Sequence, residues 1–109
     1  MTRLCFVLDQ NVAWMKRPLR RRGFLVFAPG EDFPDDVGDY ELLLYAERTG
    51  CVVVSTDRFF RGKPMAVYIP LEWTGRRSRY NSWDLVTKVV KLAAMGMREW
   101  RWRSQRSSY

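Results

Sequence analysis

Two aspartates stand at the ends of short apolar segments, and a third opens a predicted helix. Asp9 follows residues 3–8, Asp57 follows residues 51–56, and Asp39 begins a segment in which apolar residues recur at helical spacing. If the two apolar segments are neighbouring strands of a parallel sheet, the carboxylates meet at the edge where the strands end. Converging carboxylates repel one another, and Mg²⁺ or Mn²⁺ prefers such hard oxygen ligands. A bound ion of this kind can activate water and stabilise charge on a phosphoryl group.

Each aspartate also has a purely structural interpretation. Asp39 can be a helix N-cap, Asp9 can cap the helix that follows it, and Asp57 can be a turn residue. Glu41 is a rival to Asp39 as the acid that this helix contributes. The pattern of residues leaves the chemical and the structural interpretations open.

The elements that would position these acids alternate along the chain. Apolar and β-branched residues predict strands over 3–8, 24–27, 51–55 and 65–69. Helices are predicted over 10–22, broken or restarted near Pro18, from Asp39 until Gly50, and from Ser82 onward. This order predicts an α/β fold of three layers, α/β/α, around a mainly parallel sheet of about four strands.

The composition fits one domain and excludes several kinds of catalytic site. The chain has 109 residues and no histidine, which removes every Ser-His or Cys-His pair. Cys5 and Cys51 are too few for a four-ligand zinc site. Both lie in apolar segments, so we expect buried free side chains, with a disulfide as the lesser alternative.

The sequence shows no signal for a membrane or for secretion. No apolar run approaches the roughly 20 residues that span a bilayer. The first residues lack the longer apolar region and the cleavage site of a signal peptide. We therefore expect a cytoplasmic protein that does not associate with membranes.

The net charge of +7 is concentrated in the second half of the chain. Residues 1–60 hold eight Lys/Arg and nine Asp/Glu, whereas residues 61–109 hold eleven and three. Such asymmetry favours a polyanionic partner. Arginines and tryptophans that could bind phosphates and stack on unpaired bases flank the last helix: Arg76, Arg77, Arg79, Arg98, Trp100, Arg101, Trp102 and Arg103. The alternative is that these tryptophans pack on the domain or on a dimer mate while the arginines are solvated.

Two segments resemble a known family. Residues 6–12, Phe-Val-Leu-Asp-Gln-Asn-Val, resemble the opening motif of small PIN-like proteins that are often encoded with toxin–antitoxin partners. Residues 39–57 resemble that group's helix, its apolar strand and the Thr-x-Asp motif after it. The resemblance covers roughly residues 3–70 and extends to the wider PIN and NYN ribonuclease class.

The resemblance implies a metal-dependent endoribonuclease. By position, Asp9, Asp39 and Asp57 resemble the catalytic acids that hold Mg²⁺ or Mn²⁺, while Asn11 and Ser55 resemble residues that support the site. We assign residues 1–97 to a PIN-like nuclease domain and residues 98–109 to a basic aromatic C-terminal tail, although the part beyond residue 72 takes no part in the resemblance. The implied partners are RNA (single-stranded or tRNA), an antitoxin protein and a second copy of the chain.

The sequence departs from the family pattern at two positions. Gln10 replaces the usual Glu, and Phe59 stands where the group commonly has a fourth acid. These departures favour a second hypothesis, a PIN-like RNA-binding or assembly module with weak or no catalysis. A DNA nuclease is a third hypothesis, because the site chemistry does not select the sugar.

Overall fold

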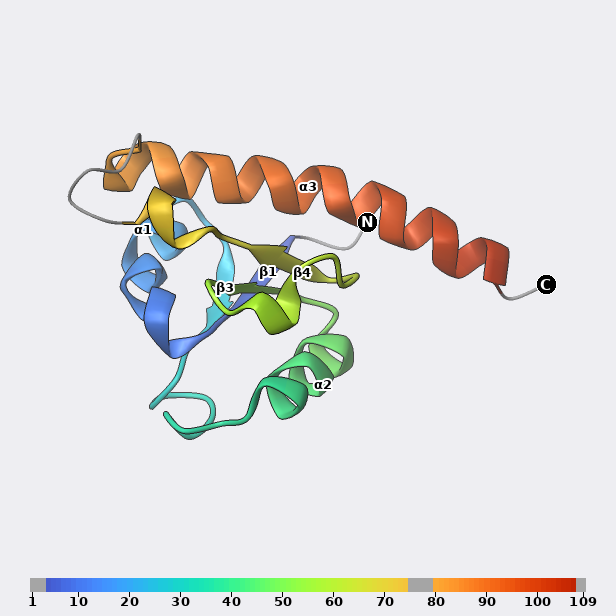
Figure 1. Cartoon of the computed structure of the whole chain (residues 1–109), viewed down its shortest axis with the longest axis horizontal. Helices are drawn as coiled ribbons and strands as arrows, with labels where there is room; N and C mark the ends of the chain where they lie inside the picture. The colour runs from blue at the N-terminus through green and yellow to red at the C-terminus, as the bar shows by residue number, and fades with distance from the viewer. Residues whose placement is uncertain (1–3, 75–79, 108–109) are drawn as a thin grey trace.

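Four short strands form one parallel sheet at the centre of the computed structural model (Figure 1). The structure describes residues 4–74 and 80–107, with side chains through residue 100. The strands are β1 (Cys5–Leu8), β2 (Leu25–Phe27), β3 (Val52–Ser55) and β4 (Ala66–Tyr68). Their order in the sheet is β2-β1-β3-β4, and every pairing is parallel. The predicted α/β fold with a parallel sheet of four strands is confirmed.

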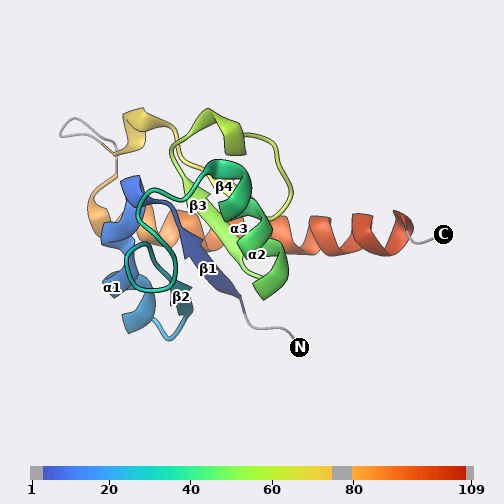
Figure 2. The same ribbon diagram turned by 90° about the horizontal axis from the view of Figure 1, so that it is seen from below.

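Helices cover both faces of this sheet, which gives the three predicted layers. Helix α2 (Asp39–Thr49) lies on one face, while α1 (Lys16–Arg21) and α3 (Ser82–Ser107) lie on the other (Figures 1 and 2). Three short 3₁₀ helices connect these elements: η1 (Gln10–Met15), η2 (Arg58–Phe60) and η3 (Leu71–Trp73). Parallel strands need such crossovers, because the chain must return to the same edge before each new strand.

The alternation of side chains along the strands builds two separate cores. Phe6 and Leu8 of β1 belong to the core under α1 and α3, whereas Val7 belongs to the core under α2. In β3, Val54 belongs to the core under α1 and α3, and Val53 belongs to the core under α2. Both strands are buried along their whole length, as expected for the centre of a parallel sheet.

The first predicted helix, 10–22, is two helices. The 3₁₀ helix η1 ends at Met15, and α1 restarts at Lys16, so Pro18 lies in the first turn of α1. Proline is tolerated there because the first-turn N–H groups have no partner within the helix. Gly23 follows with a φ of 90°, which favours glycine, and lets the chain turn into β2.

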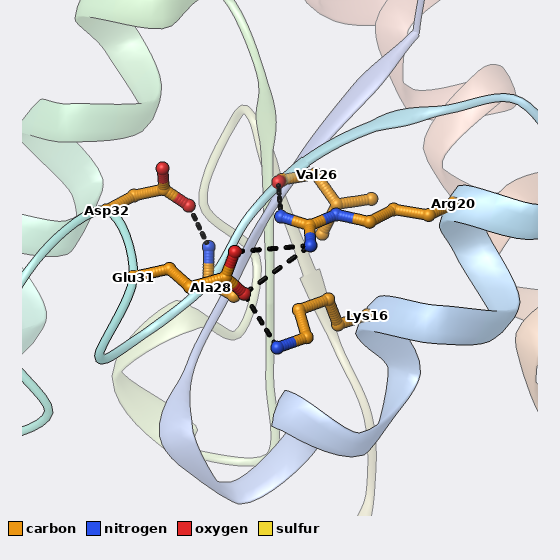
Figure 3. Close-up of polar contacts among 6 residues, drawn as sticks. All are labelled: Lys16, Arg20, Val26, Ala28, Glu31 and Asp32. Atoms are coloured by element: carbon orange, nitrogen blue, oxygen red, sulfur yellow. Dashed lines mark hydrogen bonds and ion pairs between the residues drawn. The ribbon is translucent and has the colours of Figure 1, made fainter.

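A small polar cluster fixes the loop between β2 and α2 (Figure 3). Glu31 accepts hydrogen bonds from Lys16 Nζ (2.6 Å) and Arg20 Nη1 (3.3 Å), both on α1. Asp32 accepts one from the Ala28 N–H (2.8 Å). The loop that leads to Asp39 is thereby anchored against the first helical segment.

Helix α3 begins at Ser82, as expected, and continues without a break to Ser107, so most of the segment assigned to the C-terminal tail is part of this helix. At about 1.5 Å per residue, its 26 residues extend for about 39 Å. Within the described residues, no helix is long and apolar enough to cross a membrane.

The expectation of free cysteines is wrong in this structure. Cys5 and Cys51 form a disulfide with a Cα–Cα distance of 4.7 Å. Cys5 begins β1, Cys51 directly precedes β3, and Phe6 pairs with Val52 in the ladder. The sequence could not show that the two cysteines stand opposite each other, because that depends on the register of strands 46 residues apart. Since disulfides are rare in the cytosol, this bond does not favour the predicted cytoplasmic location.

We predict that reducing this disulfide lowers the free energy of unfolding by about 2–4 kcal/mol, because the bond restricts the unfolded chain. Thiol titration of the air-oxidised protein in denaturant should find no free thiol. Urea unfolding with and without reductant measures the loss. The double variant Cys5→Ala/Cys51→Ala is the control and should not respond to reductant. Two reactive thiols in the oxidised protein would contradict the assignment.

Candidate active site

Two of the predicted acids lie at neighbouring strand ends. Asp9 follows β1 and Asp57 follows β3 by two residues, and these strands pair with Leu8 opposite Val54. The Asp9 N–H donates to the Val54 carbonyl (3.0 Å), which extends the ladder one residue beyond β1. Asp9 and Asp57 therefore share the carboxyl edge of the sheet, as the sequence predicted.

The Ser55 hydroxyl links these two acids. It donates to Asp9 Oδ2 (2.6 Å) and accepts from the Asp57 N–H (3.0 Å). Ser55 is completely buried, so this hydroxyl has a fixed position. The supporting role that the resemblance implied for Ser55 has a structural basis, since its hydroxyl holds Asp9 in place relative to the turn that carries Asp57.

The two strand-end acids also have local structural roles. Asp9 Oδ1 accepts from the Gln10 N–H (2.8 Å) and caps η1, while Asp57 Oδ1 accepts from the Phe59 N–H (2.9 Å) and caps η2. Asn11 Oδ1 accepts from the Thr56 N–H (3.5 Å). The capping interpretation of Asp9 is therefore correct, and Asp57, which was interpreted as a turn residue, caps the short helix of that turn. Capping fixes the orientation of both acids without occupying every lone pair.

Asp39 reaches the same edge from α2. Gly38 is the N-cap of this helix and Asp39 is its first residue, so the N-cap interpretation of Asp39 is wrong. Partial burial raises the pKa of Asp39, and the negative charge of Asp57, a hydrogen bond to Asp57 and the charge of Asp9 raise it further. Glu41 is exposed in the same turn. The structure thus couples Asp39 electrostatically to both strand-end acids.

The three carboxylates do not form a ready metal centre. Among residues 4–74 and the described part of α3, no group of three or more His, Cys, Asp or Glu side chains is arranged to hold a metal ion. The mutual repulsion that raises the pKa of Asp39 is a cost that a cation would relieve. The donor chemistry therefore suits a divalent cation, whereas the present side-chain positions would have to draw closer to ligate one.

Phe59, where the PIN-like proteins that this sequence resembles commonly have an acid, has an apolar environment. Its ring packs edge-to-face on Phe60 (5.0 Å between centroids) and against the core under α2. Lys63 Nζ lies 4.1 Å from the centre of the Phe59 ring, which is a cation–π contact. This position is therefore part of the packing of the loop rather than part of the acidic edge.

Two of the predicted RNA-binding residues around α3, Arg98 and Trp100, have described side chains, and their environments differ. Arg98 is exposed, while Trp100 is half-buried and packs against the core under α1 and α3. Both views show α3 pointing away from the strand ends, with its last turns beyond the sheet (Figures 1 and 2). The remaining predicted residues lie outside the described side chains: Arg76, Arg77, Arg79, Arg101, Trp102 and Arg103.

An aromatic and basic group that was given no role from the sequence lies on the helical segment that follows Asp9. Trp14 in η1 is 43% exposed, and Arg17 and Arg21 are exposed on α1. The sequence feature that could have identified this group is one tryptophan among five basic residues, with no acidic residue, between positions 10 and 22.

Comparisons with protein-family models, curated proteins and solved structures found no match to this chain. The resemblance to the PIN-like family therefore rests on the motifs in the sequence.

We predict that Ser55→Ala lowers the free energy of unfolding by about 1–3 kcal/mol, because it removes a buried hydroxyl that donates to one acid and accepts from the turn of the other. Urea unfolding measures the loss. Thr56→Ala, one residue along the chain, is the control and should cost less. An unchanged stability of Ser55→Ala would show that the hydroxyl does not organise this edge.

We predict a pH-dependent difference between Asp39→Asn and Glu41→Gln. The pKa of Asp39 is higher in the folded than in the unfolded protein, so its ionisation costs stability as the pH rises through these values. Both variants lose one acid from the first turn of α2, and only Asp39→Asn also removes the repulsion. At pH 7 in EDTA, Asp39→Asn should be the more stable by less than about 1 kcal/mol, because solvent screens the charges.

This difference should disappear below the ordinary pKa of aspartate, where both carboxyls are protonated. Chemical denaturation at pH 3 and pH 7 provides the comparison. A difference that is equal at both pH values would exclude charge repulsion as its cause.

Proposed function

We propose that this chain is a metal-dependent endoribonuclease of PIN-like type, in which Asp9, Asp39 and Asp57 hold Mg²⁺ or Mn²⁺. The observation that carries the proposal is the electrostatic coupling of Asp39 to Asp57 and Asp9 at the carboxyl edge of two neighbouring parallel strands. Ligands of α/β sheets bind outside this edge. Burial and the two neighbouring acids raise the pKa of Asp39, and a cation would stabilise this arrangement.

The residues of the chain would position the reacting groups. Ser55 and the Gln10 N–H orient Asp9, and the Phe59 N–H orients Asp57, so two acids are fixed before a substrate arrives. Asp39 is the first residue of α2, and it interacts with Asp57 through its side chain. A divalent ion bound there supplies Lewis-acid chemistry for attack of water on a phosphodiester.

The choice of RNA as substrate rests on charge and on the family resemblance. The net charge of +7 favours a polyanion, but it does not distinguish RNA from DNA. The resemblance favours RNA, and also an antitoxin partner and a homodimer. Competition between single-stranded RNA and DNA of the same sequence would test the choice of sugar.

The second candidate is a non-catalytic RNA-binding or assembly module. Two observations favour it: Phe59 packs against the core where the family has an acid, and the three aspartates are not arranged as a metal centre. A module of this kind needs the basic surface but not the acids. Removing an acid would then leave RNA binding unchanged or strengthen it, because one repulsive charge is lost.

We predict that the purified protein cleaves a labelled single-stranded RNA pool with Mn²⁺ or Mg²⁺ and not with EDTA. Asp9→Asn and Asp57→Asn should each lower the cleavage rate by at least about 100-fold, because each removes a carboxylate that would hold the metal ion, and the ion stabilises the charge of the transition state. Gel analysis of the cleavage products over time measures both rates.

Asp36→Asn is the matched control, since Asp36 is an exposed acid of the loop before α2 and its loss changes the net charge equally. It should leave the rate unchanged. Folding of each variant is checked by thermal unfolding. Absence of cleavage with every metal, in a folded protein that binds RNA, would reject the nuclease and favour the module.

A further inference from the structure

Three exposed side chains form a continuous strip along η1 and α1: Trp14, Arg17 and Arg21. They are spaced three and four residues apart, so they lie on one side of the helical segment. Met15 and Leu19, on the opposite side, are completely buried in the core. We refer to these three residues as the η1–α1 strip.

The arginines of this strip differ from the other basic residues nearby. Lys16 and Arg20 bind Glu31, and Arg20 also donates to the Val26 carbonyl (Figure 3). Arg22 lies over the Trp83 ring at 4.0 Å and donates to the Trp83 carbonyl.

Arg17 and Arg21, in contrast, have no hydrogen bond or ion pair within the described part of the chain. Their guanidinium groups are available for a ligand, and each can bind a phosphate through two N–H groups.

The strip begins at the acidic edge. Helix η1 starts directly after Asp9, and Asn11 in its first turn accepts a hydrogen bond from the Thr56 N–H beside Asp57. Both views place η1 at the end of the molecule where the strands end and α3 begins (Figures 1 and 2). From there α1 leads back toward the start of β2, where Leu25 pairs with Cys5. From Trp14 to Arg21 the strip extends for about 11 Å. This length corresponds to about three stacked nucleotides at ~3.4 Å each.

We propose that the η1–α1 strip binds the single-stranded part of a nucleic-acid substrate next to the bond that is cleaved. Trp14 stacks on an unpaired base, and Arg17 and Arg21 bind backbone phosphates. The inference rests on the proposed function for the location of the cleaved bond, but strand binding can be measured without cleavage. In this proposal the substrate reaches the acids along η1 and not from the C-terminal end of α3.

The composition of the strip favours a nucleic acid over a protein partner. In residues 10–22, Trp14 is the only exposed large apolar side chain, and its neighbours toward the acids are the polar Gln10 and Asn11. Protein interfaces have a fully buried apolar centre, which one tryptophan does not supply. One ring beside unpaired guanidinium groups is the combination that binds a single strand.

The test is fluorescence anisotropy of a labelled 12-nucleotide single-stranded RNA with the full-length protein in EDTA. Trp14→Ala should weaken binding about tenfold, whereas Trp14→Phe, which keeps a ring, should bind nearly as the wild type. Arg17→Ala/Arg21→Ala should weaken binding and reduce the slope of log K against log salt by about 1.4, the value for two single-strand phosphate contacts.

Two controls separate the strip from general effects. Arg48→Ala removes one charge from an exposed arginine in the last turn of α2, and it should change affinity by less than about twofold. A 12-base-pair RNA duplex offers no unpaired base, so Trp14→Ala should leave duplex binding unchanged.

The outcomes for the strip and for the nuclease are distinguishable. Unchanged RNA affinity in Trp14→Ala and in the double arginine variant overturns the strip, whether or not the wild type cleaves RNA. If these variants lose binding of a poly-glutamate peptide but keep binding of RNA, the strip is a site for an acidic protein. If they lose RNA binding and the wild type does not cleave RNA with any metal, the strip is kept and the nuclease is rejected.

Discussion

The parallel pairing of β1 with β3 is the interaction on which the geometry of this molecule depends. The two strands are fully buried, and their ladder continues past β1 through the hydrogen bond from the Asp9 N–H to the Val54 carbonyl. At one end of the pair the Ser55 hydroxyl joins Asp9 to the turn of Asp57, and at the other end Cys5 and Cys51 are covalently bonded. A shift of register by one residue would turn every buried side chain of one strand to the other face and would separate the two acids.

The acidic edge is electrostatically asymmetric because of where each acid comes from. The strand-end acids accept hydrogen bonds from backbone N–H groups and from Ser55, and such bonds stabilise a carboxylate. Asp39 stands inside the first turn of α2 with Gly38 as the cap, and burial and its two neighbours raise its pKa. Asp39 therefore takes up a proton more readily than an ordinary aspartate, and a cation at this edge would relieve the cost of its ionisation.

Local patterns predicted more of this structure than long-range ones. The strands, the start of α2 at Asp39 and the shared edge of Asp9 and Asp57 follow from apolar runs and from the rule for parallel sheets. The disulfide depended on register, which no local pattern contains. The continuation of α3 beyond residue 97 was not predicted, because the aromatic and arginine residues there were interpreted as a ligand surface. Trp100 instead extends the packing of the helix on the core. The disulfide and the end of α3 both depend on tertiary contacts.

The loop after β3 explains how a nucleic acid could approach an edge that carries three acids. A fourth carboxylate at the position of Phe59 would strengthen a metal site but would also repel phosphates. Here that position packs into the core and carries Lys63 over its ring, and the same loop adds Arg58 and Arg61. Residues 57–63 thus contribute one acid and three bases. The η1–α1 strip adds Arg17 and Arg21 on the segment that follows Asp9. If the proposed function is correct, the field of these bases attracts a polyanion toward the acids. An aromatic residue at position 59 in place of an acid would then weaken the metal site and favour contact with a phosphate backbone.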